Sequence, residues 1–206
     1  PLSIYATKKV LNILNSNSVF NVLNPDFVER REVSLNQTIL LEDKNKNSTG
    51  IEVEVFPVPG KVALFLEDKT KGNNFGTNAE DTIGLKIIDT KTKKYFFYIP
   101  GCADMTDNLK NRLKGAPLVF FDGTLWKDDE MLTAKVGVKK TGQRMGHMSM
   151  SGNKGSIEMF KDLNVKKKIF IHINTTNPAL LEDSLERKKA NEEGWEVSYD
   201  GMEVNL

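Results

Sequence analysis

The sequence lacks the features that would place this protein in a membrane or outside the cell. Its 206 residues include one cysteine, Cys102, so no disulfide can form within the chain and a reducing compartment is favoured. No apolar run approaches the roughly 20 residues that a membrane-spanning helix requires, and the amino terminus has no basic-then-apolar signal pattern. We therefore expect a cytoplasmic protein without a membrane span.

An excess of either charge is also lacking. The 29 basic and 28 acidic residues give a net charge of +1, which provides no electrostatic reason to expect nucleic acid or an anionic membrane as a partner. A small-molecule ligand is compatible with this balance, and a homodimer stays open. Because Pro1 leads directly into an apolar stretch, we expect that a preceding segment is missing.

Strand-like and helix-like apolar patterns alternate along most of the chain, which predicts an α/β fold. A polar stretch over 67–81 is typical of a surface loop. We expect one domain over 1–206, with mixed β-sheets and helices packed outside them. The predicted strands are 4–6, 51–55, 62–66, 82–88, 95–99, 118–121, 168–173 and 195–199, and the predicted helices begin at Thr7 (ended by Pro25) and span 106–113, 156–163 and 184–193.

Polar residues follow several apolar strands at the point where each strand ends. Asp122 follows 118–121, and His172 lies at the end of 169–171. Ligands of open α/β sheets bind outside the carboxyl ends of strands, so we expect these two side chains to meet in one cleft. Carboxylate and imidazole are ligand types that zinc and non-haem ferrous iron favour. The alternatives are a structural histidine bonded to a carbonyl and an aspartate that caps Gly123 and Thr124.

A loop rich in glycine and methionine over 141–152 carries the other histidine, His147. Such a loop can deliver a histidine as a proton donor and Arg144 as a clamp for a carboxylate. The alternative is a helix-entry loop with a solvated arginine. The acids after Trp126 fit a helix amino-terminal turn, and we expect Cys102 to be buried and inert.

Several runs of the sequence closely resemble the coenzyme PQQ synthesis protein B (PqqB) family of the metallo-β-lactamase superfamily. The two most specific runs are Asp122–Met131 and Arg144–Gly152, and the shorter ones are 56–64, 100–103, 171–174, 176–178 and 194–197. They occur in the family's order and cover nearly the whole chain, as its carboxyl-terminal two-thirds.

The resemblance implies an αββα metallo-β-lactamase-like fold, incomplete at the amino terminus, and a role in making pyrroloquinoline quinone (PQQ) from a peptide-derived cross-linked glutamate and tyrosine. It implies His172 and Asp122 as metal ligands and His147 and Asp122 as catalytic residues. The expected substrate-binding residues are Arg144, Lys140, Thr124, Trp126 and Asn174. One divalent metal is expected, with iron favoured over zinc and a ligand set that is incomplete in this chain.

Three functions remain in competition. The leading hypothesis is an iron-dependent oxidoreductase that hydroxylates the tyrosine-derived ring. The second is a carrier that assists the transport of PQQ or its precursor toward the periplasm. The third is a zinc-dependent hydrolase, which is disfavoured because expected ligands of a two-metal site are missing near Gly101–Cys102 and Val58–Pro59.

Overall fold

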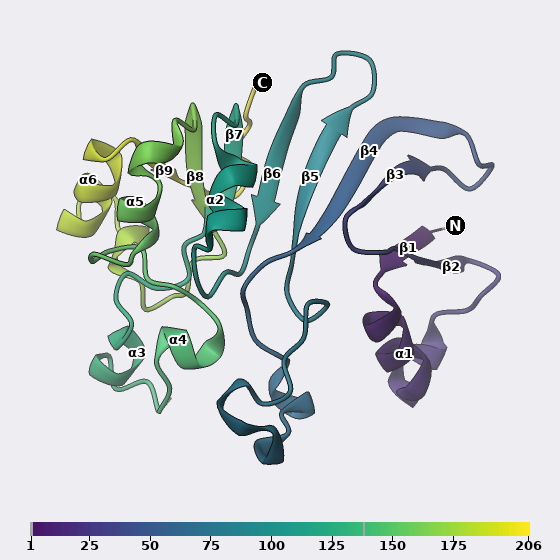
Figure 1. Ribbon diagram of the computed structural model, residues 1–206, viewed down its shortest axis with the longest axis horizontal. Coiled ribbons are helices and arrows are strands. Elements are labelled where there is room, and N and C mark those ends of the chain that lie inside the picture. The colour runs from purple at the N-terminus through teal and green to yellow at the C-terminus, as the bar shows by residue number, and fades with distance from the viewer. Residues whose placement is uncertain (1, 138) are drawn as a thin grey trace.

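The computed structural model describes residues 2–137 and 139–206; Pro1, where we expect a missing segment to precede the chain, and Val138 lie outside these ranges. Two sheets form, one with two strands and one with seven (Figure 1). The small sheet pairs β1 (Leu2–Ala6) with β2 (Val28–Glu32) in parallel, and α1 (Lys8–Ser16) connects them. The predicted long first helix is interrupted at Asn17, after which a 3-10 helix runs over Ser18–Val22.

The large sheet is mixed, as the sequence predicts. Its strands lie in the order of the chain, and the strands from β3 to β6 are antiparallel while those from β6 to β9 are parallel. Their bounds are β3 Gln37–Glu42, β4 Ser48–Pro57, β5 Ile83–Asp89, β6 Tyr95–Ile99, β7 Leu118–Asp122, β8 Lys167–Ile171 and β9 Trp195–Val197.

The helices α2 (Asp107–Leu113), α5 (Ser156–Met159) and α6 (Leu185–Glu192) pack against one face of the parallel strands (Figure 1). The short helices α3 (Glu130–Thr133) and α4 (Gly142–Met145) lie beyond the end of the sheet, in the connection after β7. Because each parallel strand runs in the same direction, the carboxyl ends of β6, β7 and β8 meet at one edge of the sheet. None of the helices in the described ranges has the length and apolar composition needed to span a bilayer.

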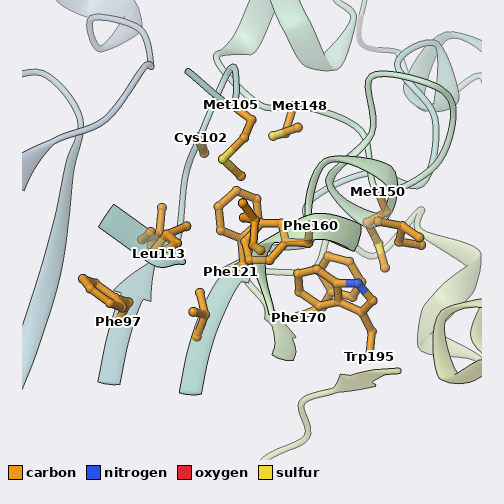
Figure 2. Close-up of a cluster of buried hydrophobic side chains, with 14 of the residues drawn as sticks. Phe97, Cys102, Met105, Leu113, Phe121, Met148, Met150, Phe160, Phe170 and Trp195 are labelled. Atoms are coloured by element: carbon orange, nitrogen blue, oxygen red, sulfur yellow. The ribbon is translucent and has the colours of Figure 1, made fainter. Parts of the chain in front are cut away.

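The main core lies between these helices and the parallel strands. Figure 2 shows the aromatic cluster at its centre, where the rings of Phe170 and Trp195 stack with centroids 3.8 Å apart. Phe121 and Phe160 pack edge to face beside them, and all four side chains are fully buried. This core fixes the position of β7 and β8, the two strands that end in Asp122 and His172.

The predicted strand over 62–66 is wrong. Only Val62 points into the core, and its amide donates to the hydroxyl of Thr77 rather than to a neighbouring strand. Leu64 and Phe65 are 65% and 73% exposed in a 3-10 turn, Leu64–Leu66. An apolar run without a strand partner cannot satisfy its backbone in a sheet. Two strands were also missed, β2 and β3, as was the short helix α4 in the loop that carries His147.

Candidate metal centre

Backbone pairing between β7 and β8 sets the position of Asp122. Asp122 is the last residue of β7 and pairs with Ile171, so it lies beside the end of β8. The next amide, that of Gly123, donates to the carbonyl of Ile171 at 2.8 Å. A Cβ at Gly123 would lie 2.9 Å from the Cβ of Phe170, so only glycine allows the two chains to approach this closely.

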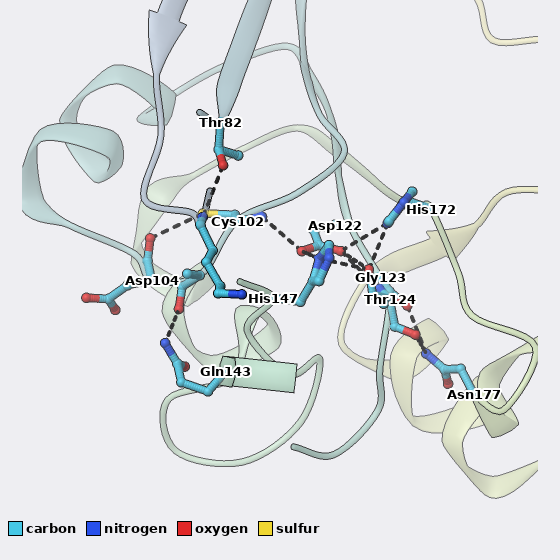
Figure 3. Close-up of polar contacts among 12 residues, drawn as sticks. Thr82, Cys102, Asp104, Asp122, Gly123, Thr124, Gln143, His147, His172 and Asn177 are labelled. Atoms are coloured by element: carbon cyan, nitrogen blue, oxygen red, sulfur yellow. Dashed lines mark hydrogen bonds and ion pairs between the residues drawn. The ribbon is translucent and has the colours of Figure 1, made fainter. Parts of the chain in front are cut away.

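The carboxylate of Asp122 is fully buried and accepts four hydrogen bonds (Figure 3). Oδ2 accepts from the Cys102 amide at 2.9 Å and lies 2.7 Å from Nδ1 of His147. Oδ1 accepts from the Thr124 amide at 3.0 Å and the Thr124 hydroxyl at 2.5 Å. Burial by itself would raise the pKa of Asp122, but the bonds from His147, His172 and Thr124 outweigh it and hold that pKa below its usual value. The carboxylate is therefore ionised at neutral pH.

Both histidines present Nδ1 to this carboxylate and its threonine. Nδ1 of His172 lies 2.8 Å from the hydroxyl oxygen of Thr124 and 3.9 Å from Oδ1 of Asp122. Because the Thr124 hydroxyl gives its single proton to Asp122, its oxygen acts as an acceptor toward His172. Each imidazole thus carries its proton on Nδ1 when neutral, which leaves Nε2 as the free basic nitrogen. Contact with Asp122 also raises the pKa of His172.

His172 adopts a backbone conformation that is unusual for a histidine. Its φ of 56° lies in the left-handed region, directly after β8 ends at Ile171. Such a conformation costs about 1 kcal/mol or more in a residue with a Cβ. The turn directs the ring toward His147, and the two rings stack with centroids 5.3 Å apart. Its side chain remains 53% exposed, so a ligand can reach it.

The two imidazoles and the carboxylate suit a divalent metal such as zinc or ferrous iron. One ligand atom each from Asp122, His147 and His172 lies within 4.8 Å of the others. In metal sites a ligating histidine donates its second N–H to a carboxylate or another acceptor, which is how both rings are arranged here. Since the lone pairs of Asp122 are already filled, it fits the role of orienting residue, and its role as a ligand stays a prediction.

Cys102 contributes its backbone to this centre. Its amide donates to Asp122, whereas its thiol is buried and contacts the carbonyl of Asp104. Burial raises the pKa of the thiol to about 12, so the thiolate form is absent at neutral pH. This agrees with the expectation of an inert cysteine.

The structure brings only Thr124, among the expected substrate-binding residues, into direct contact with the histidines. Trp126 is buried, and its backbone amide donates to the carboxylate of Glu130. The side-chain amide of Asn174 donates to the hydroxyl of Thr176. Lys140 is partly exposed on the segment before α4. Substrate contacts by these residues stay predictions.

Arg144 is engaged within the protein. Its guanidinium makes two bonds to the carboxylate of Glu67, at 2.8 and 3.1 Å, and lies 4.0 Å above the ring of Phe75. Lys61 also contacts Glu67, and these two cations lower the pKa of Glu67 to about 2. The polar stretch 67–81 is thereby attached to the helix that leads to His147. Sequence reasoning missed Glu67 because 77 positions separate it from Arg144 and no local pattern marks it.

Comparison with known proteins identifies relatives along the whole chain. The family model described as a β-lactamase superfamily domain matches residues 1–173. Coenzyme PQQ synthesis protein B of Xanthomonas oryzae pv. oryzae is 47% identical over 206 residues, which are 100% of this chain and 65% of that protein. The protein of the same name from Gluconacetobacter diazotrophicus is 50% identical over 204 residues, 99% of this chain and 65% of its own length.

A solved structure agrees with these matches. The crystal structure of Zn²⁺-bound PqqB from Methylobacterium extorquens superposes with a TM-score of 0.89 at 42% identity, covering 100% of this chain and 65% of that one. The chain therefore spans about 65% of the length of the relatives that it matches. The expected metallo-β-lactamase-like fold is confirmed.

Proposed function

The chain belongs to the β-lactamase superfamily domain family and, within that superfamily, to the PqqB group, and from this membership we propose that it serves PQQ biosynthesis as a metal-dependent oxidoreductase. The proposed reaction is hydroxylation of the tyrosine-derived ring of the cross-linked glutamate–tyrosine intermediate. The observation that carries the proposal is the cluster of Asp122, Thr124, His147 and His172, in which both rings turn Nδ1 to the carboxylate or its threonine and leave Nε2 without a partner among them.

In this proposal Asp122 and Thr124 orient the two imidazole rings and hold their protons on Nδ1. Asp122 holds the proton of His147 on Nδ1 and stabilises the positive charge that forms when Nε2 takes up a proton. Thr124 accepts the Nδ1 proton of His172 and so directs Nε2 of that ring outward. His147 would move a proton at Nε2, and His172 would hold the metal.

The metal itself would be held by Nε2 of His172, with Asp122 as the second expected ligand or as the carboxylate that orients the ring, while Nε2 of His147 stays free for proton transfer. Bound ferrous iron would supply oxygen chemistry and bound zinc would supply Lewis acidity. The M. extorquens relative is a Zn²⁺-bound protein, which supports a divalent-metal site of this ligand type.

The guanidinium of Arg144 would bind a substrate carboxylate only after its two bonds to the carboxylate of Glu67 break. A substrate acid group and Glu67 compete for the same bidentate face of the guanidinium. Lys140, Trp126 and Asn174 are further candidates for substrate contact around the same edge of the sheet. The triacid PQQ would meet the same cations, so binding alone does not distinguish the oxidoreductase from a carrier.

The test combines metal binding with turnover. Anaerobic iron titration followed by oxygen uptake on the cross-linked substrate should show stoichiometric iron and substrate-dependent uptake. Both should be lost in His172→Ala and retained in Asp200→Asn, a matched change of an exposed turn carboxyl. PQQ binding without iron or turnover would overturn the proposal in favour of a carrier. Zinc-dependent cleavage of an ester or phosphodiester would overturn it in favour of a hydrolase.

A further inference from the structure

The segment before the polar stretch 67–81 packs directly against Gly146, the residue that precedes His147. Gly146 has a φ of 92°, and a Cβ there would lie 2.9 Å from the Cβ of Lys61 and 3.1 Å from its backbone nitrogen. The Lys61 amide donates to the hydroxyl of Thr82 at 3.2 Å, which fixes this segment beside the start of β5. Glycine at position 146 therefore allows the loop of His147 to rest on this segment.

The polar stretch itself reaches the same loop through Arg144. Both carboxylate oxygens of Glu67 contact the Arg144 guanidinium, and the Glu67 side chain is only 5% exposed. A carboxylate that has lost its hydration remains charged only beside cations, which here are Arg144 and Lys61. The ring of Phe75 lies against both cations, with Nζ of Lys61 5.3 Å from its centroid. We call Lys61, Glu67, Phe75 and Arg144 the Arg144 cluster.

The backbone of their own segment holds Glu67 and Phe75 in place. The Asp68 amide donates to the carbonyl of Phe75 at 3.0 Å, which closes a small loop next to Glu67. The amide of Val62 donates to the hydroxyl of Thr77 at 3.0 Å and ties the far end of this loop to the segment before it. The carboxylate and the ring therefore face Arg144 as a preformed pair.

A short closed turn joins Arg144 to His147. The His147 amide donates to the carbonyl of Gly142 at 3.0 Å, and the Arg144 amide donates to the hydroxyl of Thr141 at 3.2 Å. Two glycines, Gly142 and Gly146, leave this turn little stiffness of its own. The side chain of His147 is 19% exposed, so its position depends on the backbone that carries it. A displacement of Arg144 would therefore move the imidazole.

We propose that Glu67 and Phe75 are positioning residues for His147. They hold Arg144, and through the turn that joins it to His147 they keep Nδ1 of this ring 2.7 Å from Oδ2 of Asp122. The ring then keeps its proton on Nδ1 and presents Nε2 as the basic nitrogen. Arg144 thus acts within the protein, as the link between the polar stretch and the histidine.

The role of Glu67 and Phe75 rests on the proposed function in one respect, because proton transfer is the task that this function gives to His147. The contacts themselves belong to the metal-free chain. They can be tested without iron, substrate or turnover, so the two proposals can fail separately.

The experiment uses the 206-residue chain labelled with ¹⁵N-histidine, with EDTA present at about pH 9, where histidine is neutral. The chain has two histidines, so the long-range ¹H–¹⁵N spectrum contains two imidazoles, and His172→Ala identifies the signals of His147. We expect the His147 proton of the wild type mainly on Nδ1. In Glu67→Gln the ratio of the Nδ1–H to the Nε2–H form should fall about fivefold, as expected for the loss of one hydrogen bond.

Two further variants separate this effect from a general change in the fold. Phe75→Leu keeps an apolar side chain but removes the ring face, and it should lower the same ratio by a smaller factor. Glu54→Gln is the matched control, because Glu54 bonds to Arg112, whose guanidinium also lies over an aromatic ring, 4.5 Å from its centroid. It should leave the ratio unchanged. In every sample Thr124 still holds Nδ1 of His172, so the ratio for His172 should stay constant.

An unchanged ratio for His147 in Glu67→Gln or in Phe75→Leu would overturn the role of that residue. An equal fall in Glu54→Gln, or an equal fall for His172, would overturn the proposal as a whole, because the effect would then be a general loosening of the protein. Iron binding and oxygen uptake by the wild type can persist in each of these cases, which separates this failure from that of the proposed function.

Discussion

His172 combines a left-handed backbone with a functional side chain, and the two can be separated by substitution. His172→Ala and His172→Gly both remove the imidazole, so both should abolish metal binding through this residue. The two variants differ only in the Cβ. Alanine has a Cβ, which makes a φ of 56° unfavourable, and glycine has none. The side chain is 53% exposed, so its removal leaves no cavity in the core.

The expected difference in the free energy of unfolding follows from two opposing terms. The left-handed conformation costs alanine about 1–2 kcal/mol, while the greater freedom of glycine in the unfolded chain returns about 0.4–1 kcal/mol of this difference. We expect His172→Gly to be more stable than His172→Ala by about 1 kcal/mol. For a chain of this length that corresponds to about 2–4 °C in Tm.

The assay is urea unfolding followed by tryptophan fluorescence, with EDTA present throughout. Lys188 provides the matched control, because it is exposed within α6. In a helix, Lys188→Ala should be more stable than Lys188→Gly, the reverse of the order expected at His172. If His172→Ala is as stable as His172→Gly, the backbone at this position stores no strain. If either variant binds stoichiometric iron in a separate anaerobic titration without EDTA, His172 is not a ligand.

Three other changes have definite expected outcomes. Phe170→Ala should lower the free energy of unfolding by about 3–5 kcal/mol in urea titration, because this ring is fully buried. Glu67→Gln should release Arg144 and speed amide exchange over α4, as followed by mass spectrometry. In the metal-free protein Asp122, with its lowered pKa, stabilises above roughly pH 4, and His172, with its raised pKa, stabilises below roughly pH 6.5. The urea midpoint of unfolding should therefore fall below this pH window, where the contribution of Asp122 is lost, and also above it, where the contribution of His172 is lost.

Each of these outcomes has a control that can contradict it. Phe65→Ala, at a 73% exposed ring, should change stability by less than about 0.5 kcal/mol. Glu182→Gln, an exposed carboxylate without an ion pair among the described residues, should leave exchange over α4 unchanged. A stability difference between wild type and His172→Ala that stays constant from pH 6 to pH 8 would refute the assigned shift of His172.

Sequence reasoning succeeded where the signal is local. The strand that ends at Asp122 and the strand that ends before His172 are apolar runs followed by polar residues, and their parallel pairing follows from the helical connections between them. The same reasoning failed at 62–66, where an equally apolar run has no strand partner and two of its side chains face solvent. Hydrophobicity indicates burial but does not provide a neighbouring strand.

The sequence by itself determined the α/β class and the family, and it marked Asp122, His147 and His172 as candidate site residues, because strand periodicity and contiguous motifs are carried by neighbouring positions. The tertiary structure alone decided the left-handed turn at His172, the proton positions that Asp122 and Thr124 impose, and the capture of Arg144 by Glu67. These depend on contacts between segments far apart in the chain. Such contacts are fixed by the packing of the whole sheet and its connections, and no local pattern records them.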